Sequence, residues 1–120
     1  MSATRKPLYF HPSCKKDYLN LPESVQDDAG YNLDRVQQGK NPRISFGPLH
    51  HLGSGVMELR LDEDTDTYRV VYVAKLSEAV FVLDAFKKKS PRGKELPQNI
   101  EARIQSRYEH AKEMNERLKQ

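Results

Sequence analysis

The chain is built around residues 55–89, which read GVMELRLDEDTDTYRVVYVAKLSEAVFVLDAFKKK and contain three β-type segments. Residues 56–62 alternate apolar and polar side chains, which is the period of a half-buried strand. Residues 67–74 and 79–86 are rich in β-branched and aromatic side chains and are apolar over several consecutive positions, as in strands buried on both faces. The polar links between these segments are short enough for hairpins, so the stretch is predicted to form a three-strand antiparallel meander.

The segment before the meander predicts a short strand and a helical hairpin. Residues 6–11 fit an edge strand, and Ser13 can cap a helix over residues 14–20. Pro22 stands where proline is favoured at a helix start, and Gly39 supplies the left-handed residue that ends the second helix. The apolar stripe of that helix and the apolar parity of the first meander strand predict that the hairpin covers one face of the sheet. These two sets are Val25, Ala29, Leu33 and Val36, and Met57, Leu59 and Leu61.

The remaining segments are a loop and a terminal helix. Residues 41–54 hold two prolines and two glycines and are expected to form a turn-rich loop. Residues 97–118 carry one narrow apolar stripe at helical spacing, which predicts a long C-terminal helix. A chain of 120 residues is long enough for a single core. We therefore expect one α+β domain over residues 1–120.

Charge and composition restrict the partners. The formal net charge is +3, and residues 87–94 carry five basic side chains without an acidic one, which favours an anionic partner. Cys14 is the only cysteine and is expected to pack as a small hydrophobe rather than to act as a nucleophile. The chain has neither an apolar run of membrane-spanning length nor a signal-peptide pattern, so a cytoplasmic protein without membrane contact is expected.

The loop over residues 41–54 also contains His50 and His51. No Cys, Asp or Glu lies nearby at ligand spacing, so no metal site is expected there. An acid–base role stays open because imidazole titrates near neutral pH, and the alternative is a pair of solvent-exposed side chains.

The order of these elements resembles the RelE/HigB superfamily of toxins from bacterial toxin–antitoxin pairs, particularly its phage-related HigB-like branch. The matching residues are 56–60 (VMELR), 68–70 (YRV) and 82–89 (VLDAFKKK) followed by Pro97, with weaker matches at residues 21–23 and 36–39. The resemblance implies a RelE-like fold and an endoribonuclease that needs no metal or other cofactor. It also implies that the substrate is mRNA, cut typically in the ribosomal A site, and that a cognate antitoxin neutralises the protein.

On the same resemblance, Arg60 and Arg69 match strand arginines near the scissile phosphate, and Lys88 and Lys89 match basic residues after the last strand. Many relatives have a histidine where this chain has Asp84. That difference leaves Asp84 itself, or His50 and His51, to transfer protons. The expected catalytic residues are Arg60, Arg69, Asp84, Lys88 and His51, and the expected RNA-binding residues are Lys87, Lys88, Lys89, Arg92 and Lys94.

The chemistry agrees with this expectation. RNA carries its own nucleophile, the 2′-hydroxyl, so cleavage requires alignment, proton transfer and stabilisation of the extra negative charge on phosphorus. Guanidinium groups held in strands bind phosphate oxygens bidentately, and lysines add positive potential.

The alternative is a non-catalytic nucleic-acid-binding or phage-derived interaction module with a basic face. Such a module would hold Arg60 and Arg69 in pairs with Glu58 or Asp84, whereas a nuclease would leave the guanidinium groups facing an open groove. The distinction depends on the hairpin register, which the sequence does not reveal.

Overall fold

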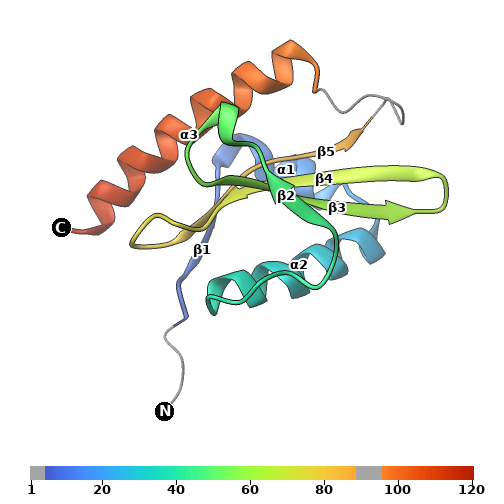
Figure 1. The fold of residues 1–120 in the computed structure, drawn as a ribbon, viewed down its shortest axis with the longest axis horizontal. Helices are drawn as coiled ribbons and strands as arrows, with labels where there is room; N and C mark the ends of the chain where they lie inside the picture. The colour runs from blue at the N-terminus through green and yellow to red at the C-terminus, as the bar shows by residue number, and fades with distance from the viewer. Residues whose placement is uncertain (1–4, 89–95) are drawn as a thin grey trace.

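A mixed sheet with helices on both faces makes up the fold (Figure 1). The computed structural model describes residues 5–88 and 96–120. In chain order the elements are β1 (Leu8–Phe10), α1 (Pro12–Leu19), α2 (Glu23–Gln37), β2 (Phe46–Pro48), the short 3₁₀ helix η1 (His50–Leu52), β3 (Val56–Glu63), β4 (Asp66–Val73), β5 (Val80–Lys88) and α3 (Gln98–Leu118). The α+β class, the central meander and the three predicted helices are therefore confirmed within the described residues.

The strand order is β1-β5-β4-β3-β2, so the β3-β4-β5 meander has β1 at one edge and β2 at the other. The N-terminal strand pairs parallel with β5, whereas the β3-β4-β5 meander is antiparallel as predicted. The prediction of a plain loop over residues 41–54 was wrong at residues 46–48, which form β2 and pair antiparallel with β3. Three residues that include Gly47 and Pro48 are too short for periodicity to reveal, and proline is tolerated because β2 is an edge strand.

The hairpin of α1 and α2 covers one face of the sheet, as the apolar patterns predicted. Val25, Ala29, Leu33 and Val36 share one core cluster with Leu59 and Leu61, and Met57 packs against it. Cys14 is completely buried in the same cluster, and burial raises the pKa of its thiol to about 11. The expectation that Cys14 packs as a hydrophobe is confirmed.

The start of α1 differs from the prediction. The helix begins at Pro12, and its cap is His11, whose Nδ1 accepts a hydrogen bond from the Ser13 backbone N–H at 3.1 Å. Ser13 therefore lies inside the first turn, and proline takes the first helical position, where its missing N–H costs nothing.

On the opposite face, α3 packs over the sheet (Figure 1) through a second core cluster that includes Val71, Leu83, Ile104 and Tyr108. The β4–β5 register shifts here, because Val71 pairs with Asp84 and Tyr72 pairs with Val82, so Leu83 lacks a cross-strand partner. A bulge of this kind redirects side chains locally. Both Leu83 and Asp84 contact α3 residues as a result.

Candidate functional site

The β3–β4 register places Arg60 directly opposite Arg69. Directly opposed residues of an antiparallel pair project from the same face of the sheet, so the two guanidinium groups are neighbours. Arg69 also shares this face with Val71, which packs toward α3. The face that α3 covers at one end therefore carries two arginines at the other.

Glu58 lies between these arginines and contacts both. Its Oε2 accepts a hydrogen bond from Arg60 Nε at 3.2 Å, and its Oε1 forms an ion pair with Arg69 Nε at 3.2 Å. The side chains of Glu58 and Arg69 are each 10% exposed, whereas that of Arg60 is 38% exposed. One nearly buried carboxylate therefore neutralises half of the charge of two opposed cations.

The outer nitrogens of the two arginines make hydrogen bonds to uncharged oxygen atoms and not to Glu58. Arg60 Nη1 donates to Ser45 Oγ at 3.2 Å and to the Phe46 carbonyl at 3.4 Å, and Arg69 Nη1 donates to the Tyr68 carbonyl at 3.4 Å. Within residues 5–88 and 96–120, neither Nη2 atom makes a hydrogen bond. Each guanidinium thus keeps donors at its outer edge.

Gly47 in β2 allows Arg60 to lie where it does. A β-carbon at this position would collide with the Arg60 guanidinium group, so only glycine permits the side chain to cross β2 this closely. The short strand that the sequence did not reveal is therefore part of the support for the arginine pair.

Lys88 joins this group from the end of β5, where it pairs with Thr67. Partial burial lowers its pKa, as do the nearby charges of Arg69 and Arg60, while the charge of Glu58 opposes the shift. We call Glu58, Arg60, Arg69 and Lys88 the cationic cluster.

A groove with a cavity volume of about 980 Å³ adjoins the cationic cluster at Lys88. It runs along the part of β5 beyond Val82, where the pairing with β1 ends, and lies between the α1–α2 junction and the start of α3. Its lining is mostly apolar with added cations, and includes Leu21, Pro22, Phe86, Ile100, Lys87, Lys88 and Arg103. Lys87 also forms an exposed ion pair with Asp66 at 3.2 Å.

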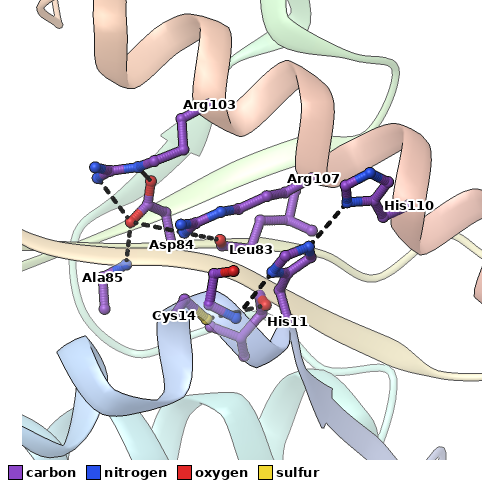
Figure 2. Close-up of polar contacts among 10 residues, drawn as sticks. His11, Cys14, Leu83, Asp84, Ala85, Arg103, Arg107 and His110 are labelled. Atoms are coloured by element: carbon purple, nitrogen blue, oxygen red, sulfur yellow. Dashed lines mark hydrogen bonds and ion pairs between the residues drawn. The ribbon is translucent and has the colours of Figure 1, made fainter.

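Asp84, one of the expected catalytic residues, lies in a closed environment (Figure 2). Its side chain is completely buried, and its two oxygens accept from Arg103 Nε at 2.7 Å and Arg103 Nη2 at 3.0 Å. The Ala85 N–H donates at 2.9 Å, and Arg107 Nη1 lies 3.4 Å away while it donates to the Leu83 carbonyl at 3.0 Å. We call Asp84, Arg103 and Arg107 the Asp84 cluster; it ties α3 to the bulge of β5.

The sequence reasoning did not single out Arg103 and Arg107. The signal was present, because the two arginines stand four residues apart and therefore lie on one face of α3. The sequence did not reveal the β-bulge in β5 that directs the Asp84 side chain toward that face.

His51 also lies apart from the arginines. Its Nε2 is 2.8 Å from Glu101 Oε2, and its carbonyl accepts from Gln105 Nε2 at 3.4 Å, so it fastens η1 to α3. His50 is exposed. Among the residues described, no group of three or more His, Cys, Asp or Glu side chains is placed to hold a metal ion.

The other two histidines form a pair beside the Asp84 cluster (Figure 2). His11 Nε2 and His110 Nδ1 are 2.9 Å apart, and the rings stack with centroids 5.2 Å apart. Because His11 Nδ1 already accepts from Ser13, its Nε2 carries the proton and donates to His110. Burial lowers the pKa of His11, and the charge of Arg107 lowers it further.

Three of the expected RNA-binding residues, Lys89, Arg92 and Lys94, lie outside the described residues. None of the helices within residues 5–88 and 96–120 combines the length and apolar character that crossing a bilayer requires.

A family model described as "Phage derived protein Gp49-like (DUF891)" matches residues 16–109. The chain therefore belongs to the phage-derived Gp49-like family, which is RelE-like and associated with toxin–antitoxin systems. No curated protein and no solved structure matches the sequence.

Proposed function

We propose that this chain is the toxin of a toxin–antitoxin pair and acts in the cytoplasm as a metal-independent endoribonuclease on mRNA at the ribosome. Membership of the Gp49-like family supports the toxin–antitoxin assignment. The observation that carries the nuclease assignment is the directly opposed pair of Arg60 and Arg69, joined by Glu58 and next to Lys88.

The charge balance of the cationic cluster favours an anionic substrate. Like charges directly opposite each other destabilise a sheet, and here three cations share one carboxylate, which leaves a formal excess of two positive charges. A phosphate that gains negative charge during attack by the 2′-hydroxyl would neutralise this excess. Fixed donors of this kind stabilise a transition state without reorganising.

In the proposed reaction the 2′-oxygen attacks the adjacent phosphorus and loses its proton to solvent. The bond from phosphorus to the 5′-oxygen breaks, and the Lys88 ammonium group donates a proton to that oxygen. The products are a 2′,3′-cyclic phosphate and a 5′-hydroxyl. Arg60 and Arg69 bind the non-bridging oxygens, and a lowered pKa makes Lys88 a better proton donor near neutral pH.

The groove along β5 offers a path for the RNA strand on either side of the scissile phosphate. Lys87 would contact backbone phosphates, and the apolar surface around Phe86 would take unstacked bases. Asp84 and His51 have no part in this mechanism, because the first is buried under two arginines and the second is paired with Glu101.

A second candidate is a non-catalytic interaction module, and one observation favours it. Both arginines pair with Glu58, as expected of a docking surface, and Arg69 as a whole is only 8% exposed. In that case the basic face binds nucleic acid or an acidic partner without cutting it.

Induction of the wild type and of Arg69→Ala in a host without the antitoxin, with mapping of RNA ends, separates the two candidates. The nuclease predicts new RNA ends and growth arrest for the wild type and their loss in the variant. Arg5→Ala is the matched control, since Arg5 also pairs with a carboxylate, that of Asp34, at an exposed position. Intact mRNA in cells that contain folded wild-type protein would favour the interaction module.

A further inference from the structure

We infer that Glu58 is a positioning residue of the proposed nuclease site, whose single carboxylate holds Arg60 and Arg69 by their Nε atoms so that their outer nitrogens face the phosphate. This inference rests on the proposed function. It assigns Glu58 a role through the arginines rather than direct contact with RNA.

The pattern of donors supports this role. An arginine can meet a carboxylate with two nitrogens, as Arg103 does when it uses Nε and Nη2 on Asp84. Glu58 instead pairs with the Nε atom of each arginine, one on each oxygen, and the hydrogen bonds of both Nη1 atoms go to other residues. The outer edge of both guanidinium groups, which is the edge suited to bidentate phosphate binding, is therefore not used by Glu58.

The surroundings make the carboxylate an effective constraint. Glu58 is 10% exposed, so its ion pairs are screened less than those of a surface residue. Its backbone is flanked on both sides, by Gly47 in β2 and by Val71 in β4, which limits how far it can shift. Without its charge the two opposed arginines would repel each other and diverge.

The same contacts argue against Glu58 as the base. Each of its oxygens already lies 3.2 Å from an arginine Nε in an ion pair, so neither is placed as a free acceptor for the 2′-hydroxyl proton. Its contribution is alignment, for which a misplacement of about 1 Å can cost about 10²-fold in rate.

The test compares Glu58→Gln with Asp62→Asn in a purified translation system programmed with a defined mRNA. Each variant loses one negative charge from β3, but the Asp62 carboxylate accepts from Thr67 and lies outside the cationic cluster. We expect Glu58→Gln to lower the maximal cleavage rate by about 10²-fold, while Asp62→Asn retains the wild-type rate.

Binding separates positioning from simple structural damage. The probe is a 2′-O-methyl RNA, which lacks the nucleophile and can be bound but not cut. Removal of a negative charge next to the arginines should leave the affinity of Glu58→Gln for this RNA equal to or higher than that of the wild type. A parallel loss of cleavage and affinity would overturn the inference, because it would indicate a damaged site.

The pH profile supplies an independent measurement. Cleavage that needs protonated Lys88 declines as the pH rises through the pKa of Lys88, and the charge of Glu58 raises that pKa. Glu58→Gln should therefore move the alkaline limb to lower pH, and Asp62→Asn should leave it in place. An unmoved limb in Glu58→Gln would count against the inference.

If Glu58→Gln does not fold, Glu58→Asp decides the matter. It keeps the charge but is one methylene shorter, so it cannot reach both Nε atoms, and we expect slower cleavage with an unchanged alkaline limb. Wild-type cleavage by Glu58→Asp would then overturn the inference. A wild-type protein that does not cleave overturns the proposed function and the inference together, whereas a cleaving wild type with an equally active Glu58→Gln overturns the inference alone.

Discussion

Two groups in this molecule have the same composition, one carboxylate with two arginines, and differ in what surrounds them. In the Asp84 cluster the carboxylate is completely buried and also accepts from a backbone N–H, and the arginines reach it from α3 with Nη atoms as well as with Nε of Arg103. In the cationic cluster the ion pairs of Glu58 are formed with the Nε atoms of arginines on the sheet itself. The first group joins two elements, and the second leaves guanidinium edges for a ligand.

The comparison shows that an arginine–carboxylate pair does not by itself indicate either structure or function. The atoms that form the pair distinguish the two roles. A guanidinium group whose outer nitrogens bond to a carboxylate has fewer donors left for a phosphate. The two clusters also differ in burial, since the Asp84 carboxylate is completely buried whereas the side chain of Arg60 in the cationic cluster is 38% exposed.

The largest effect is expected from Asp84→Asn, which removes the anion shared by Arg103 and Arg107. A buried cation that loses its partner typically costs about 3–5 kcal/mol of unfolding free energy. Denaturant unfolding of the variant should show this loss. Glu58→Asp, which keeps its charge, is the comparison in the cationic cluster, and an equal loss there would contradict the distinction between the two groups.

Next in size is the effect of Arg69→Ala on cleavage. Loss of one preorganised donor to a developing negative charge typically costs about 2.7–4 kcal/mol in the transition state, or about 10²–10³-fold in rate. Rates of mRNA cleavage, measured at matched amounts of folded protein, check this expectation. Arg107→Ala should instead lower the unfolding free energy, and a similar fall in rate at matched folded protein would contradict its structural role.

A smaller effect is expected from Lys88→Ala on RNA binding. Each phosphate contact contributes about 0.7 to the slope of log affinity against log salt for single strands, so the variant should bind more weakly and with a slope that is less steep by about that amount. Titration of a 2′-O-methyl RNA at several salt concentrations measures it. Lys112→Ala, a change on the exposed side of α3, should leave the slope unchanged.

The smallest effect concerns pH and the histidine pair beside Arg107. The pKa of His11 is lowered in the folded state, so below about pH 6.5 the unfolded chain takes up the proton first. The stability contribution of neutral His11 should therefore be fully present above that pH. It should decrease as the pH falls from about 6.5 through the lowered pKa of His11 in the folded state. Thermal unfolding across this range should show a shallower decline in His11→Gln, and identical profiles would rule out a contribution from His11.

Most of the fold could be predicted from the sequence because the helices and the meander strands have a regular local spacing of apolar residues. The alternation in Val56 to Asp62 and the helical stripe from Val25 to Val36 each name one apolar face, and the two faces meet in one core cluster. The parallel pairing of β1 with β5 and the three-residue β2 had no such signal, since they depend on contacts between distant segments.

The candidate site could likewise be predicted only in part from the sequence. The family resemblance pointed to Arg60, Arg69 and Lys88 as candidate phosphate ligands, and strand arginines and lysines after a strand are suited to that chemistry. Only the tertiary structure placed Arg60 opposite Arg69, brought Gly47 beneath Arg60, and turned Asp84 toward Arg103 and Arg107. Register and bulge are set by the packing of whole elements, and a shift of one residue moves a side chain to the other face of a sheet. That is why the sequence could suggest the candidate residues and their chemistry, whereas only the tertiary structure showed which of them lie together.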